Sequence, residues 1–157
     1  MLWGFRENGR LVFSGGCRMK TILVVDDDTN ARRSVRYVLK SHGYRVIEAP
    51  SGVAALSSLK KESIDLVILD LVMPQMDGTA VCDRMKADTA LSQIPVIIFT
   101  MVRGEVCRDW SRYVKANAYM SKPFQIRDLL AAVKQLLGSP VQDENALGEP
   151  ALPAPQS

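Results

Sequence analysis

The sequence predicts an α/β protein in which a doubly wound sheet of five parallel strands is covered by helices on both faces. Five short apolar runs alternate with segments of helical periodicity between residues 20 and 138. Most of these runs are apolar at successive positions, which is typical of strands buried on both faces of a parallel sheet. Five repeats favour an open three-layer sandwich, because a closed barrel would need eight.

The expected elements follow in strict alternation, and turn and capping residues separate them. Strands are expected at residues 21–25, 44–48, 65–69, 95–99 and 118–120. Helices are expected at residues 30–42, 51–61, 103–115 and 125–137, with another from the Asp77-Gly78 turn to about residue 88. Asp28 or Thr29 is expected to cap the first helix and Ser51 the second, while Gly43 ends the first.

Two terminal segments fall outside this pattern. Residues 1–19 scatter glycines without any period, so we expect a disordered N-terminal extension. Residues 139–157 contain four prolines and few large apolar side chains, which predicts a disordered tail. The folded domain is therefore expected at residues 20–138.

Composition limits the classes of function. A formal net charge of +3 is too small to favour binding of nucleic acid or of a membrane surface. The three cysteines are far apart and form no C-x-x-C pair, which argues against a disulfide framework and a zinc site and suits a reducing compartment. No apolar run reaches the length of a membrane span. These features predict a cytoplasmic location.

Polar residues follow four of the five predicted strands. Asp26, Asp27 and Asp28 follow the first strand, Asp70 the third, Thr100 the fourth and Lys122 the fifth. Ligands of such sheets bind at the carboxyl ends of the strands. The chemically capable side chains of this chain therefore converge on one edge of the sheet.

Helix capping is the simpler explanation for one of these residues and fails for another. An aspartate at a strand end is commonly the cap of the next helix, and Asp28 fits that role. Asp70 does not, because a loop separates it from the next helix. Two carboxylates about 4 Å apart, such as Asp27 and Asp70, repel by about 4 kcal/mol at an effective dielectric near 20. Either one takes a proton or a cation lies between them.

Magnesium and a phosphate group suit this set of residues. Mg²⁺ prefers carboxylate and carbonyl oxygens, and it retains water and phosphate ligands. Lys122 offers a point charge and Thr100 a hydroxyl donor to phosphoryl oxygens. With the charge neutralised in this way, a carboxylate can act as a nucleophile and form an acyl phosphate. Asp70 is the best candidate for that nucleophile.

Four segments of the chain resemble the receiver domain of bacterial two-component response regulators. They are residues 22–28 (ILVVDDD), 67–78 (VILDLVMPQMDG), 95–100 (PVIIFT) and 119–124 (YMSKPF), within a resemblance that covers roughly residues 20–138. The resemblance implies a flavodoxin-like (βα)5 fold. Lys-Pro alone is a weak signal, but the four segments in this order are highly specific.

The resemblance also implies a role for each residue of the edge. Asp70 is then the phosphorylated residue, and Asp26, Asp27, Asp70 and the backbone carbonyl of Val72 hold Mg²⁺. Lys122, after which a cis bond to Pro123 is implied, contacts the phosphoryl group. Thr100 and Tyr119 act as a switch that couples the site to the face formed by residues 103–115, 118–120 and 125–137.

The predicted function is a single-domain response regulator that takes a phosphoryl group from a sensor histidine kinase or a phosphotransfer protein. It is expected to signal by docking a downstream protein target, and the resemblance also allows a homodimer that depends on phosphorylation. Such a protein is a phosphoacceptor and not an enzyme acting on other substrates. A receiver that binds partners without phosphorylation is a second interpretation, and a small Mg²⁺-dependent phosphatase is a third.

Several residues depart from the family pattern or have plainer interpretations. Met101 stands where the family usually has a small residue, and Val72 offers no polar group to a hydrolytic water. We therefore expect slow self-dephosphorylation. Lys115 and Ala118 replace frequent glycines. Arg32, Arg33 and Arg36 are interpreted as a solvated helix face, although the family docks kinases at its first helix, and Met73, Met76 and Met85 are interpreted as packing residues.

Overall fold

An open parallel sheet lies at the centre of the computed structural model, which describes residues 3–7, 10–14, 18–101 and 114–138. Its strands are β3 (Thr21–Val25), β4 (Arg45–Ala49), β5 (Leu66–Leu69), β6 (Val96–Thr100) and β7 (Ala118–Ser121). Their order is β4-β3-β5-β6-β7, and every neighbouring pair is parallel. The predicted doubly wound sheet of five strands is therefore confirmed.

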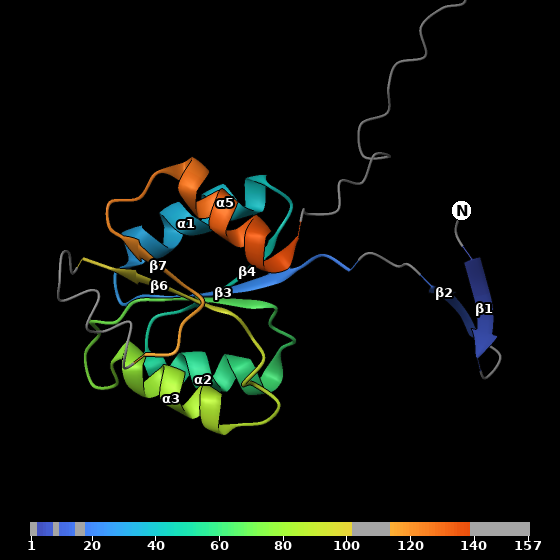
Figure 1. Cartoon of the computed structure of the whole chain (residues 1–157), viewed down its shortest axis with the longest axis horizontal. Helices are drawn as coiled ribbons and strands as arrows, with labels where there is room; N and C mark the ends of the chain where they lie inside the picture. Colours follow the sequence, from blue (N-terminus) through green and yellow to red (C-terminus); the bar gives the residue numbers. More distant parts are fainter. Residues whose placement is uncertain (1–2, 8–9, 15–17, 102–113, 139–157) are drawn as a thin grey trace, which may run out of the picture.

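Helices cover both faces of this sheet, as Figure 1 shows. Helices α1 (Thr29–Ser41) and α5 (Ile126–Leu137) lie on one face, and α2 (Gly52–Lys61) and α3 (Gly78–Ala87) lie on the other. Successive residues of β3 alternate between two buried clusters, with Ile22 and Val24 on one face and Leu23 and Val25 on the other. Burial on both faces explains why this strand is apolar throughout.

The helix boundaries follow from local capping. The Asp28 carboxylate accepts a hydrogen bond from the Asn30 N–H at 2.8 Å, and Ser51 Oγ accepts one from the Ala54 N–H at 3.2 Å. Gly43 follows α1 with φ of 85°, a left-handed conformation that glycine adopts without steric cost. The predicted caps of α1 and α2 and the end of α1 are confirmed.

The edge strands differ from the predicted pattern. Strands β3, β5 and β6 are buried along their whole length, but β4 and β7 are partly exposed. Continuous burial on both faces is therefore a property of the three central strands only. The loops that carry the three aspartates of the edge follow two of these central strands, β3 and β5.

The chain before β3 contains a further element. Residues 1–19 were expected to be disordered, but β1 (Trp3–Glu7) and β2 (Arg10–Ser14) pair as an antiparallel hairpin. The helix expected at residues 103–115 and the tail at 139–157 lie almost entirely outside the described residues. Among the helices that are described, none is long and apolar enough to span a bilayer.

Candidate functional site

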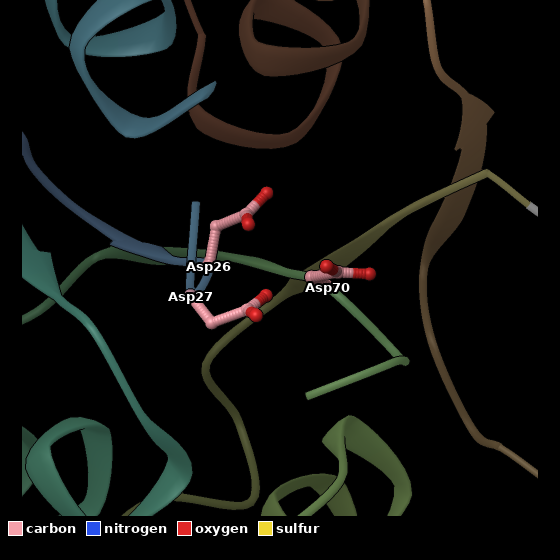
Figure 2. A group of neighbouring side chains, drawn as sticks. All are labelled: Asp26, Asp27 and Asp70. Atoms are coloured by element: carbon pink, nitrogen blue, oxygen red, sulfur yellow. The ribbon is translucent and has the colours of Figure 1, made fainter. Parts of the chain in front are cut away.

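Three aspartates meet where β3 and β5 end. Val25 pairs with Leu69 across these neighbouring strands, so the residues that follow each strand emerge side by side. One carboxylate oxygen from each of Asp26, Asp27 and Asp70 lies within 4.8 Å of the others. Figure 2 shows the three side chains gathered at this edge. Asp26 and Asp70 are buried and Asp27 is exposed, so the cluster is accessible from one side.

The two buried aspartates make the same local turn. Asp26 Oδ1 accepts a hydrogen bond from the Asp28 N–H at 2.9 Å, and Asp70 Oδ1 accepts one from the Val72 N–H at 3.1 Å. Each carboxylate therefore uses one oxygen to hold its own loop. The other oxygen, Oδ2 in both residues, contacts the Lys122 ammonium, at 3.3 Å in the case of Asp70.

Lys122 follows the edge strand β7, and its side chain reaches the aspartates that follow β3 and β5. Its backbone N–H donates to the Thr100 carbonyl at 2.8 Å, and its peptide bond to Pro123 is cis, as the family resemblance implied. Its Nζ lies 5.7 Å from the centre of the Phe99 ring, a cation–π distance. Phe99 itself packs edge-to-face on Phe124. The sequence analysis assigned Phe99 no such role.

Burial and charge shift the ionisation of Asp70 and Lys122. Burial raises the pKa of Asp70 above its ordinary value, and the Asp26 charge adds to this, although the Val72 N–H and Lys122 oppose it. Burial alone would lower the pKa of Lys122, but the hydrogen bonds and charges of Asp26 and Asp70 outweigh burial and raise it. Lys122 is therefore a firmly charged group beside a carboxylate that is held at some electrostatic cost.

The charge of the cluster fits a divalent cation. Three carboxylates and one ammonium leave a formal charge of 3 − 1 = 2 negative charges at neutral pH. The donors are all oxygen atoms, and the Val72 carbonyl belongs to the same loop as Asp70. Mg²⁺ prefers such ligands, whereas zinc prefers nitrogen and sulfur. The residues at this edge therefore fit Mg²⁺.

A glycine packs against the backbone of Asp70. A Cβ atom on Gly78 would lie 2.3 Å from the Asp70 carbonyl oxygen and 2.9 Å from the Leu71 Cα. The Gly78 N–H also donates to the Leu71 carbonyl at 2.9 Å. The carboxylate of the preceding residue, Asp77, accepts a hydrogen bond from the Ala80 N–H at 3.0 Å and so caps α3. Helix α3 is thereby fastened directly to the loop that carries Asp70.

The remaining predicted site residues lie along β6 and β7. Thr100 is buried and is the last residue of β6, beside the strand that Asp70 follows. Tyr119 is half-buried on β7, and its hydroxyl donates a hydrogen bond to the Val114 carbonyl. Val72 and Met101 follow β5 and β6 and are 65% and 70% exposed. Two apolar side chains thus flank the acidic edge.

One of the basic residues on α1 does not lie where the sequence analysis expected it. Arg32 was interpreted as part of a solvated helix face, but its side chain is only 12% exposed and contacts the loop after β3. Arg33 is exposed as predicted. Helical spacing alone did not predict that Arg32 is largely buried while Arg33 is exposed. The difference arises because the acidic loop and β4 both lie beside this turn of α1.

Comparison with known proteins identifies the family. Residues 22–134 match the response regulator receiver domain, and the chain belongs to this family. Receiver domains are signalling domains of two-component systems, they interact with histidine kinases, and they bind Mg²⁺ where they are phosphorylated. The predicted family is therefore confirmed.

Individual relatives agree with this assignment. The chain is 38% identical over 130 residues to a probable transcriptional regulator, ycf27, of Pyropia yezoensis, covering 82% of this chain and 52% of that protein. It spans about half the length of the first curated relatives it matches. Chemotaxis protein CheY4 of Vibrio cholerae has 28% identity and a TM-score of 0.72, covering 76% of this chain and all of that structure.

A third relative is the receiver domain of sensor histidine kinase PA1611 from Pseudomonas aeruginosa. Its structure has 25% identity and a TM-score of 0.72, covering 78% of this chain and 100% of that one. It is described with a magnesium ion coordinated in its active site cleft.

Proposed function

We propose that this chain acts as a response regulator that accepts a phosphoryl group from a histidine kinase or phosphotransfer protein on Asp70. The arrangement around the Asp70 carboxylate carries this proposal. Its Oδ2 lies 3.3 Å from the Lys122 ammonium, and oxygens of Asp26 and Asp27 lie within 4.8 Å. The proposed nucleophile, the carboxylates that would bind the cation and the ammonium that would bind phosphate thus lie together at one edge of the sheet.

The cation would be held by Asp26, Asp27, Asp70 and the Val72 carbonyl. When bound, Mg²⁺ neutralises negative charge on a transferring phosphoryl group. The magnesium ion reported for the PA1611 receiver domain supports this assignment by analogy. Zinc suits the cluster less well, because its three members are carboxylates and include neither histidine nor cysteine.

Phosphoryl transfer to Asp70 balances without a further reactant. A carboxylate oxygen of Asp70 forms a bond to phosphorus while the bond from phosphorus to the donor histidine nitrogen breaks, and that nitrogen keeps the electron pair. Lys122 already contacts Asp26 and Asp70, so it can shift to the phosphoryl oxygens without crossing the site. The Thr100 hydroxyl supplies a further donor from the end of β6.

The phosphorylated state would be signalled through Thr100 and Tyr119. The phosphoryl group carries about −1.5 to −2 charges in place of the single charge of the Asp70 carboxylate, and such a change of charge and shape can bias an element that has two arrangements. Tyr119 is tied to the Val114 carbonyl, so movement of its ring would alter the segment that leads into β7. The output face would comprise residues 103–115 with β7 and α5, where a protein target or a second copy could dock.

Phosphorylation of the intact protein tests this proposal. The protein is incubated with Mg²⁺ and acetyl phosphate and weighed intact, beside Asp70→Asn and an EDTA control. We expect a mass increase of one phosphoryl group that is lost in the variant and in EDTA. Absence of an adduct would indicate a receiver that signals without phosphorylation. Rapid consumption of acetyl phosphate without an adduct would indicate a phosphatase.

A further inference from the structure

The Arg32 side chain lies beneath the loop that carries Asp26 and Asp27. Its Nη1 donates to the backbone carbonyl of Asp26 at 2.7 Å, and its Nη2 donates to Thr29 Oγ1 at 3.3 Å. The side chain is 12% exposed, although arginine is almost never buried without partners. One guanidinium group therefore joins the acidic loop to the first turn of α1.

A glutamate on β4 anchors the same guanidinium from the other side. Arg32 Nε lies 3.5 Å from Glu48 Oε1, an ion-pair distance at which Nε makes no hydrogen bond. The other oxygen, Glu48 Oε2, accepts a hydrogen bond from Arg36 Nη1 at 2.6 Å. Because β4 pairs with β3 along its whole length, the anchor is part of the sheet itself.

The backbone of Asp26 is held by hydrogen bonds at both its N–H and its carbonyl group. Its N–H donates to the Ala49 carbonyl on β4 at 3.2 Å, and its carbonyl accepts from Arg32. The Asp26 carboxylate is then restrained by the Asp28 N–H. Only Arg32 among these partners is a side chain that substitution can remove without altering the backbone or the carboxylates.

We propose that Arg32 is a positioning residue that holds the Asp26 peptide, and so aims the Asp26 and Asp27 carboxylates at Asp70 for Mg²⁺. This inference rests on the proposed function, since it concerns the affinity of the same site. The forked guanidinium is required, because it reaches the Asp26 carbonyl and Thr29 with separate nitrogens. A lysine at this position keeps the charge but has a single terminal nitrogen.

Arg33 offers a matched control for the charge. It is the next residue on α1, carries the same charge, is exposed, and takes part in none of the ion pairs found within residues 18–101 and 114–138. A long-range effect of positive charge on the acidic cluster would be shared by Arg32 and Arg33. An effect of the hydrogen bond to the Asp26 carbonyl would belong to Arg32 alone.

Magnesium titration of the whole chain separates these explanations. The Kd of Mg²⁺ is measured by isothermal titration calorimetry for wild type, Arg32→Gln, Arg32→Lys and Arg33→Gln. The free energy of unfolding of each is measured in urea with EDTA. We expect Arg32→Gln to weaken Mg²⁺ binding about tenfold, the scale found when partners of metal ligands are removed. Arg32→Lys should retain its fold and still lose about fivefold, with Arg33→Gln within about twofold.

Each other result contradicts the inference in a distinct way. If Arg32→Gln lowers the free energy of unfolding but leaves the Mg²⁺ Kd unchanged, Arg32 only stabilises the fold. If Arg32→Lys binds as wild type does, or Arg33→Gln weakens binding equally, charge and not position is responsible. If Arg32→Gln does not fold, the Arg32→Lys titration decides. If wild type binds no Mg²⁺, the proposed function fails together with this inference.

Discussion

The loops after β3 and β5 both begin with a buried aspartate and both end with an aspartate that caps a helix. Asp26 and Asp28 bound the first loop, and Asp70 and Asp77 bound the second. In each, the buried aspartate holds the N–H of the second residue after it. The first loop is short, at residues 26–28, and the second is longer, at residues 70–77.

The two loops are held in place by different means. A side chain, Arg32, fastens the first loop through the Asp26 carbonyl. Backbone contact with Gly78 fastens the second, where the buried side chain of Met73 also packs into the core. One loop is therefore sensitive to loss of a hydrogen bond, and the other to added volume.

Environment gives the aspartates of the second loop opposite ionisation behaviour. The Thr79 hydroxyl and the Ala80 N–H hold the pKa of Asp77 below its ordinary value. Burial raises the pKa of Asp70. The charged form of Asp77 is thus stabilised by the fold, whereas the charged form of Asp70 is destabilised by it. A charged group held at such a cost is typical of a binding or catalytic site.

The largest effect is expected from adding one methyl group to the second loop. Gly78→Ala should lower the free energy of unfolding by about 3 kcal/mol, because the new Cβ meets backbone atoms of Asp70 and Leu71 that cannot give way. Gly52 is the matched control, since it is also the first residue of a helix and its Cβ would meet side-chain atoms of Val81 and Met76. Urea unfolding measures both. Equal losses would contradict the proposed packing.

Removing the cap at the end of the second loop should have a smaller effect. Asp77→Ala is expected to lower the free energy of unfolding by about 1.5 kcal/mol, because two hydrogen bonds at the start of α3 are lost. Asp77→Asn keeps an acceptor and should lose less. Since the folded pKa of Asp77 is depressed, its contribution is present above the unfolded pKa and disappears as pH falls through the folded pKa. An equal Asp77→Ala loss at acid and neutral pH would argue against this.

Replacing the buried aspartate of the same loop should act in the opposite direction. Asp70→Asn is expected to raise the free energy of unfolding in EDTA at neutral pH by about 1 kcal/mol, because a buried charge beside Asp26 is removed. A raised folded pKa means that stability falls as pH rises from the ordinary value of 3.8 through the folded pKa. Denaturation at several pH values should show this fall in wild type and a reduced one in the variant. A less stable variant would contradict the assigned cause.

The smallest effect concerns the residue two positions after each buried aspartate. That residue is Asp28 in the first loop and the exposed, apolar Val72 in the second. We expect Val72→Asn to shorten the lifetime of the phosphorylated protein about threefold, or ~0.65 kcal/mol, by offering a polar partner to the attacking water. Decay is followed by intact mass after removal of acetyl phosphate. A wild-type lifetime of only seconds would contradict slow self-dephosphorylation.

Most of the fold was predictable because it depends on local patterns. Apolar runs, the caps Asp28 and Ser51, and Gly43 placed the elements of the sheet within a residue or two. The partial exposure of β4 and β7 was not predictable in this way, because strand order is a property of the whole chain. The pairing of β1 with β2 was also not predicted, since that segment lacks a clear period.

The candidate site was predictable where strand ends supply the residues. Asp26, Asp27 and Asp70 come together because their strands are neighbours. Two residues that contact the site were not predicted, Arg32 at the Asp26 carbonyl and Phe99 beside Lys122. Arg32 has the same type and helical setting as exposed Arg33, and Phe99 looks like any core aromatic. Their roles depend on which loop or side chain packs beside them, and sequence spacing does not encode this.

Location of the phosphoryl group tests the central proposal most directly. The protein phosphorylated by acetyl phosphate and Mg²⁺ is treated with borohydride, which reduces an aspartyl phosphate to homoserine, and the modified residue is found by tandem mass spectrometry. We predict homoserine at position 70 alone. Homoserine at Asp26, Asp27 or Asp28, or an adduct that survives in Asp70→Asn, would contradict the assignment of Asp70 as the phosphoacceptor.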